Sequence, residues 1–153
     1  MASADAYPYR TSVEVAFHDL DLLGHVNNVV FLTYLETARV KFLCQMLDLA
    51  HPAELPVILA EVTATYKAPA FFGEVLTIGV GVSRFGGKSF DMLHSISGGD
   101  GRLVLVARTV LVAYDYATRT TVAVPEQLKQ RVLEFQAGWQ PPMWPPAPAA
   151  AAR

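Results

Sequence analysis

Apolar and polar residues alternate near the start of the chain. Val13 and Val15 share one side of an extended backbone with Phe17, while Glu14 falls on the other side. A period of two residues is typical of a strand with one buried face. The pattern therefore predicts a first strand over Thr11–Phe17.

A second pattern, with a period of 3.6 residues, runs from about Asn27 to Asp48 without proline or glycine. Its apolar side chains gather on one side of a helical wheel, opposite the polar ones; the apolar set is Phe31, Leu35, Ala38, Phe42 and Met46. Such a wide apolar face predicts a long helix that other elements cover. Asn27 or Asn28 can cap this helix, because a short amide side chain accepts hydrogen bonds from the free N–H groups of the first turn.

The rest of the chain is rich in β-branched residues and predicts four strands and a short helix. The strands are expected over Val57–Tyr66, Val75–Phe85, Ser89–Ser97 and Arg102–Tyr114. Glycine-rich segments separate the last three and favour hairpins, so we expect an antiparallel meander. Pro125 begins a helix that reaches about Gln136, since proline is tolerated in a first turn. One strand, a long helix and four more strands indicate an α+β fold with the sheet curled around the helix.

The length of 153 residues fits one domain. We assign residues 1–137 to that domain. Residues 138–153 interleave proline with alanine and predict an extended or disordered tail.

Composition narrows the classes of function. Hydrophobic residues make up 52% of the chain and charged residues 17%, and the mean hydropathy of +0.29 indicates apolar surface suited to self-association. A net charge of −2 supplies no basic field for nucleic acid. The apolar runs are too short to span a membrane, and no secretory signal is visible. The single cysteine, Cys44, excludes an internal disulfide and suits a reducing compartment, so we expect a cytoplasmic protein.

Candidate chemistry is concentrated between the first strand and the long helix. The run from Phe17 to Asn28 brings carboxylate, imidazole, glycine and amide groups together in twelve residues. Polar groups gathered at a junction between a strand and a helix indicate a functional site.

This run resembles the hotdog-fold acyl-CoA thioesterases of the 4-hydroxybenzoyl-CoA thioesterase type. The similarity lies in Asp19–Asn28 and in Tyr34–Arg39, with further support from Tyr66–Pro69 before Gly73–Ile78 and from Lys88–Phe90. It covers about residues 13–125. The resemblance implies an antiparallel sheet of about five strands wrapped around a central helix. It also implies hydrolysis of a fatty or aromatic acyl thioester of coenzyme A, or of acyl carrier protein, without a cofactor.

The resemblance also implies roles for individual residues. Asp21 corresponds to the catalytic carboxylate, which attacks the thioester carbonyl or deprotonates a water that does so. The backbone N–H near Asn28 polarises the carbonyl, helped by the positive end of the helix. Gly24 permits the turn and the approach of substrate to the main chain. His25 is expected to position water, bond the thioester oxygen or act as an acid.

Other polar residues are expected to be structural. Asp19 holds the loop through bonds to nearby N–H groups. Glu36 matches the position of a catalytic glutamate in a second group of hotdog thioesterases, but an ion pair with Arg39 is the simpler interpretation. His18, Asp19, Asp21 and His25 are of types that bind zinc or iron. Because no further ligand is evident and His18 is expected to point away from Phe17, we expect no metal site.

The sequence also suggests how the substrate is held and how subunits associate. Coenzyme A is anionic, so Lys88 and Arg84, which lie on either side of the turn at Gly86 and Gly87, are the candidates to hold its nucleotide. The resemblance implies a homodimer with two sites at the subunit interface, paired into a homotetramer, in which Asp21 of one subunit works beside Lys88 or Arg84 of another.

Two other functions remain open from the sequence. Hydration or dehydration of acyl thioesters occurs on the same fold, and Asp21 with His25 does not exclude that chemistry. A non-catalytic acyl-CoA-binding protein is the third possibility, because the fold does not decide function.

Overall fold

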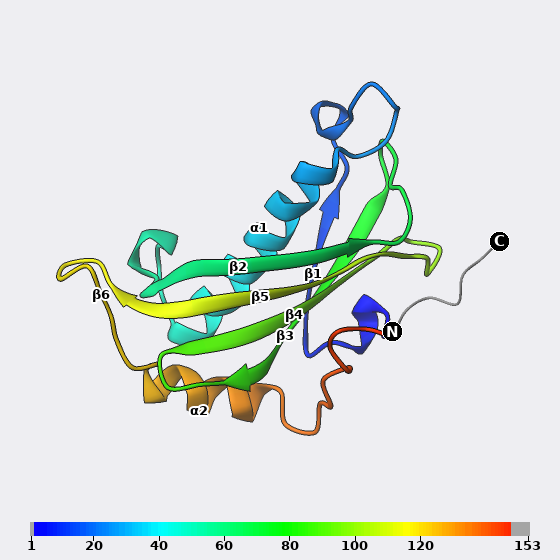
Figure 1. Ribbon diagram of the computed structural model, residues 1–153. Helices are drawn as coiled ribbons and strands as arrows, with labels where there is room; N and C mark the ends of the chain where they lie inside the picture. Colours follow the sequence, from blue (N-terminus) through cyan, green and yellow to red (C-terminus); the bar gives the residue numbers. More distant parts are fainter. Residues whose placement is uncertain (1, 148–153) are drawn as a thin grey trace.

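The computed structural model describes residues 2–147, in which one long helix lies across a curved antiparallel sheet (Figure 1). The helices are α1 (Asn28–Leu47) and α2 (Glu126–Phe135). The strands are β1 (Tyr9–Glu14), β2 (Val57–Tyr66), β3 (Val75–Phe85), β4 (Ser89–Ser97), β5 (Leu103–Asp115) and β6 (Thr120–Thr121). The predicted α+β architecture is confirmed.

The sheet has the strand order β1-β3-β4-β5-β2, with β6 paired to β5. The hairpins β3–β4 and β4–β5 follow the predicted glycine turns. The predicted meander is wrong for β2, which pairs with β5 from Val57↔Ala113 to Tyr66↔Leu105. Because β1 already occupies the free edge of β3, β2 joins the opposite edge of the sheet. This placement leaves β2 as an edge strand beside α1.

The first strand is displaced from its predicted bounds. It begins at Tyr9 and ends at Glu14, and Phe17–Asp19 forms a turn of 3-10 helix. The carboxylate of Asp19 causes the change, since its Oδ2 accepts the Ala16 N–H at 3.0 Å and so turns the chain. Phe17 is consequently 78% exposed instead of sharing the buried side with Val15.

The central helix matches its predicted pattern. Asn27 is the cap, because its Oδ1 accepts the Val29 N–H at 2.8 Å. The predicted apolar face is buried throughout, and the helix also buries Tyr34, Arg39 and Leu43. A fully buried side chain of this size contributes about 1.5–3 kcal/mol to folding. The burial of this face anchors α1, and with it the position of the loop that precedes it.

The segment that follows α2 packs back on the sheet at Gln136 and Trp139. The side chain of Gln136 bonds both backbone groups of Val82, accepting its N–H at 3.1 Å and donating to its carbonyl at 2.7 Å. Trp139 lies so close to Gly81 that a Cβ there would come within 2.5 Å of the indole ring. From 138 to 147 the chain has no helix or strand, and the rest of the predicted tail, 148–153, lies outside the described residues. Between residues 2 and 147, no helix is long and apolar enough to cross a membrane.

Candidate active site

A tight turn holds the candidate catalytic residues. The Gly24 N–H donates to the Asp21 carbonyl at 3.1 Å, and the Asp21 N–H donates to the His25 carbonyl at 3.1 Å. Gly24 has a φ of +85°, which only glycine adopts readily, while a Cβ at this position would meet no atom within 4 Å. Gly24 is therefore required by the backbone conformation and not by lack of space.

The Asp21 carboxylate is held at one oxygen and open at the other. Its Oδ1 accepts the Leu23 N–H at 2.8 Å, whereas Oδ2 has no donor in the described part of the chain. The residue is half-buried. A carboxylate fixed in this way presents a lone pair that can attack a carbonyl or take a proton from water.

Asp21, His25 and Asn28 line a single cavity of about 480 Å³ between the turn, the start of α1 and the end of β2. The other lining residues are Leu23, Val26, Phe31, Tyr66, Lys67, Ala68 and Pro69. The structure thus brings together three of the four predicted catalytic residues in one cavity. Gly24 lies outside the lining and shapes the turn.

Asn28 supplies a free backbone donor. It is the first residue of α1, and its N–H has no acceptor among residues 2–147. The positive end of the helix dipole lies at the same place. A donor of this kind can stabilise an oxyanion that forms on a bound thioester.

Asp19 holds the loop and does not enter the cavity. Its Oδ2 accepts the Tyr34 hydroxyl at 2.6 Å as well as the Ala16 N–H. Its backbone carbonyl accepts the Asn27 N–H at 2.9 Å. The bonds from Tyr34 and Asn27 connect the loop to α1, and the bond from Ala16 fixes the turn within the loop, in line with the predicted structural role.

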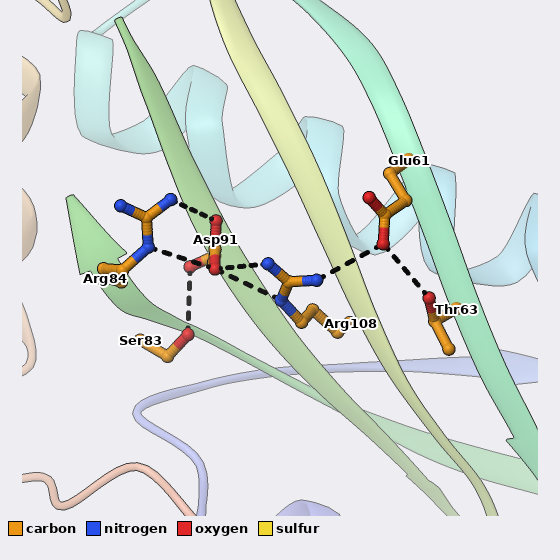
Figure 2. A network of polar contacts seen from close by, with 6 residues as sticks. All are labelled: Glu61, Thr63, Ser83, Arg84, Asp91 and Arg108. Atoms are coloured by element: carbon orange, nitrogen blue, oxygen red, sulfur yellow. Dashed lines mark hydrogen bonds and ion pairs between the residues drawn. The ribbon is translucent and has the colours of Figure 1, made fainter. Parts of the chain in front are cut away.

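Lys88 and Arg84 lie at the far end of the sheet from Asp21. Lys88 is exposed in the β3–β4 turn. Arg84 bonds Asp91 at 3.1 and 3.3 Å, in a network that Arg108 shares on the face of the sheet away from α1 (Figure 2). Within one chain these cations are not part of the Asp21 cavity.

Three lining residues have no site signal in the sequence. The helical pattern places Phe31 only in the core, and Tyr66 and Lys67 fall only within a run of family resemblance. Lys67 is exposed and is the only lysine or arginine that lines the cavity within the described residues. These residues meet Asp21 only because the end of β2 lies beside the start of α1, and no local pattern reveals that contact.

The remaining candidates lie elsewhere. Glu36 pairs with Arg39 at 3.8 Å and lines a different cavity of about 180 Å³. His18 is exposed, with Nε2 at 3.4 Å from Asp19 Oδ1. Burial raises the pKa of the Cys44 thiol, which disfavours the nucleophilic thiolate. In the described part of the chain, no three His, Cys, Asp or Glu side chains are grouped to hold a metal ion.

Comparison with known proteins identifies the family of the chain. A family model described as the thioesterase-like superfamily matches residues 15–132. The long-chain acyl-CoA thioesterase FadM of Escherichia coli (strain K12) is 25% identical over 126 residues, which cover 80% of this chain and 96% of that protein.

Solved structures share the fold. A thioesterase from Thermus thermophilus, solved with coenzyme A and zinc, has a TM-score of 0.79 and 29% identity, covering 86% of this chain and 96% of its own. The PA5185 protein from Pseudomonas aeruginosa strain PAO1 has a TM-score of 0.78 and 25% identity, covering 90% of this chain and 98% of its own. The predicted hotdog fold is confirmed.

Proposed function

The chain belongs to the thioesterase-like superfamily, and from that premise we propose that it hydrolyses acyl-CoA thioesters at the cavity lined by Asp21, His25 and Asn28. One observation carries the proposal: a carboxylate with an open oxygen and an unpaired helix N–H line the same cavity. Thioester hydrolysis needs both groups. The similarity to FadM, a long-chain acyl-CoA thioesterase, supports a fatty acyl-CoA as the substrate.

In the proposed reaction, Asp21 Oδ2 either attacks the thioester carbonyl or removes a proton from the attacking water. Direct attack expels the coenzyme A thiolate and leaves an acyl–Asp21 anhydride that water then hydrolyses, whereas in the second route the activated water displaces the thiolate itself. Both routes consume one water, break the C–S bond and yield a free acid and the thiol of coenzyme A. Negative charge that develops on the carbonyl oxygen is stabilised by the Asn28 N–H and the positive end of α1. His25 lines the same cavity and contacts the substrate, where it positions water, bonds the thioester oxygen or donates a proton.

A homodimer through β2 is part of this proposal. Among residues 2–147, β2 pairs only with β5, so its outer edge leaves backbone groups free. It also exposes apolar side chains: Ile58, Leu59 and Val62 are between 36% and 42% exposed. A long apolar edge of this kind favours pairing with another strand. In a two-fold dimer, the two β2 edges would pair antiparallel.

Antiparallel pairing would bring opposite ends of the two sheets together. The end of β2 at Tyr66 borders the Asp21 cavity, and it would face the beginning of the second subunit's β2 at Val57. Val57 pairs with Ala113, whose N–H bonds the Lys88 carbonyl at 2.8 Å. Lys88 of the second subunit would therefore lie about two strand spacings, roughly 10 Å, from the β2 edge. This geometry supports a shared site in which Lys88 or Arg84 of one subunit holds the coenzyme A bound at Asp21 of the other.

The tetramer stays a prediction. A cytoplasmic location is part of the same proposal, and the single cysteine of the chain supports it.

Release of thiol from a panel of saturated acyl-CoAs, together with the absorbance of an enoyl-CoA, tests the reaction. We expect thiol release from the saturated acyl-CoAs, and any loss of the enoyl absorbance to be matched by release of thiol. Loss of that absorbance without thiol release would instead establish a hydratase, and binding without either reaction would establish a non-catalytic acyl-CoA-binding protein.

Mixing two inactive variants tests the shared site. Asp21→Asn and Lys88→Ala subunits, unfolded together and refolded as mixed dimers, are expected to regain part of the wild-type activity because one of the two sites is then intact. Activity that stays at the level of the separate variants would contradict the shared site.

A further inference from the structure

One arginine is buried without a hydrogen-bond acceptor in its own subunit. Arg39 lies in the middle of α1 and is only 6% exposed. Within residues 2–147, the nearest carboxylate is that of Glu36, whose Oε2 is 3.8 Å from Arg39 Nη2. That distance is too long for a hydrogen bond, and the guanidinium makes no other hydrogen bond in this part of the chain. Burial lowers the pKa of Arg39, as expected for a cation removed from water.

Glu36 and Arg39 lie beside the middle of β2. Together with Leu59 they line two cavities in the gap between α1 and β2, one of about 410 Å³ and the other of about 180 Å³. The smaller cavity also reaches Val62. Leu59 and Val62 lie on either side of the midpoint of β2. The two charged side chains are therefore close to the centre of the free strand edge.

The proposed dimer would place its two-fold axis at this centre. When two β2 strands pair antiparallel along their full length, the axis passes between their midpoints, and both helices α1 lie on the same face of the joined sheet. The paired strands are about 4.8 Å apart, and neighbouring helices pack roughly 8–10 Å apart. Side chains of the second α1 would therefore enter the two cavities beside Glu36 and Arg39.

The charges of the two copies are complementary at the axis. Each copy offers the carboxylate of Glu36, whose side chain is 65% exposed, and the buried guanidinium of Arg39. The two-fold axis presents the same two groups in the opposite order, so Arg39 of one copy meets Glu36 of the other. A buried guanidinium is stabilised only when acceptors complete its hydrogen bonds, and a carboxylate of the second copy supplies them.

We propose that Arg39 of each subunit pairs with Glu36 of the other, and that these two ion pairs set the register of the β2–β2 contact; the inference rests on the proposed dimer. A backbone ladder alone permits registers two residues apart, because each side chain then keeps its face of the sheet. Such a slip would move Lys88 of one subunit by roughly 7 Å relative to Asp21 of the other. The ion pairs thus keep the shared site assembled.

Exchange of the two charges tests the pairing. Glu36→Arg leaves two cations at these positions and Arg39→Glu leaves two anions, so each variant repels itself across the axis. A mixed dimer of the two variants restores both ion pairs between subunits, whereas the contact within each subunit stays repulsive. Native mass spectrometry of the mixture distinguishes mixed dimers from homodimers, and sedimentation equilibrium gives the dissociation constants.

The dissociation constant of each homodimer is expected to rise at least about 100-fold, because the dimer exchanges two attractive charge pairs for two repulsive ones. The mixed dimer is expected to return to within about tenfold of wild type. A mixture that forms no more mixed dimer than homodimer would overturn the inference, because a contact confined to one subunit cannot be rescued by mixing.

Glu36→Gln keeps the test decisive if Arg39→Glu, at a buried position, does not fold. It removes one charge from an exposed side chain, and the dissociation constant of the dimer is expected to rise about tenfold. Glu14→Gln is the matched control, because Glu14 is exposed on β1 at the opposite edge of the sheet, and the dissociation constant is expected to stay unchanged. Equal constants for Glu36→Gln and wild type would overturn the ion pairs.

The failure of this inference differs from the failure of the proposed function. A wild-type dimer that the Glu36 and Arg39 substitutions leave unchanged would overturn the ion pairs and leave the β2 dimer standing. A wild-type protein that stays monomeric would overturn both. Release of thiol from acyl-CoA by the wild-type protein is measured separately, so the enzyme proposal is judged on its own result.

Discussion

The bond between Tyr34 and Asp19 is expected to be one of the main constraints on the active-site loop. Replacing Tyr34 with phenylalanine removes the hydroxyl that donates to Asp19 Oδ2 at 2.6 Å. The ring remains, so its packing against Phe31, with the ring centres 5.9 Å apart, is retained. Burial and the Asp19 carboxylate raise the pKa of Tyr34 well above its ordinary value, so the wild-type hydroxyl donates over the whole assay range.

The size of the expected stability loss in Tyr34→Phe follows from the burial of the Asp19 carboxylate. The Asp19 side chain is 12% exposed, so water replaces the lost hydroxyl poorly. A hydrogen bond to a charged group contributes about 1.5–3 kcal/mol, and we expect Tyr34→Phe to lower the free energy of unfolding by about 2 kcal/mol. For a chain of this size, that loss corresponds to a decrease in Tm of roughly 4–8 °C.

Urea and thermal unfolding of the two proteins measure this loss. Tyr116→Phe serves as the control, because the Tyr116 hydroxyl donates to the Val57 carbonyl at 2.7 Å and the residue is 57% exposed, so its loss is expected to cost less than about 1 kcal/mol. If Tyr34→Phe destabilises the protein no more than Tyr116→Phe does, Asp19 does not depend on this bond and the reasoning fails.

Three other substitutions probe the packing around the sheet. Asp91→Asn weakens the acceptor of two arginine side chains at a position only 5% exposed, and is expected to lower the free energy of unfolding by about 2 kcal/mol in urea; a loss below about 0.5 kcal/mol would contradict this. Burial, followed by the charge of Arg39, lowers the pKa of His94 to about 3. His94 therefore binds a proton near pH 6.5 in the unfolded chain but not in the folded one, so the free energy of unfolding is expected to fall by about 2 kcal/mol between pH 7 and pH 5. His94→Gln is expected to remove this pH dependence. Equal pH slopes of the free energy of unfolding in the two proteins would refute the assignment to His94. Gly81→Ala is expected to lower the free energy of unfolding by about 1–3 kcal/mol, because the added Cβ meets Trp139. This loss is expected to be smaller in a Trp139→Ala background. An equal loss in both backgrounds would exclude the contact with Trp139 as its cause.

Local patterns predicted most of the secondary structure. β2, β3 and β4 have the predicted bounds because β-branched runs end at glycine or proline turns. β1 ended early because the Asp19 carboxylate turns the chain, and that carboxylate is held by Tyr34, fifteen residues away. The position of β2 at the sheet edge depends on which strand edges are occupied, a property that no single segment contains.

The candidate site also combines residues that the sequence pointed to with residues that only the tertiary structure reveals. The family resemblance implied roles for Asp21, His25 and Asn28, and these three residues line one cavity because one turn and one helix start bring them together within eight residues. Tyr66 joins them from another strand through a bond across the gap between β2 and α1. Contacts of that kind depend on tertiary structure and have no local signal in the sequence.

The most direct test of the central claim is the rate of thiol release by Asp21→Asn at saturating acyl-CoA. The amide oxygen can still accept the Leu23 N–H that holds Asp21 Oδ1, so the turn is expected to persist. We predict a rate at least about 100-fold below wild type, because a catalytic carboxylate contributes a factor of about 10² or more. The affinity for a butyl thioether of coenzyme A, which has no thioester carbonyl and is not hydrolysed, is expected to remain within about threefold of wild type. A rate within about threefold of wild type would contradict the assignment of Asp21 as the catalytic carboxylate.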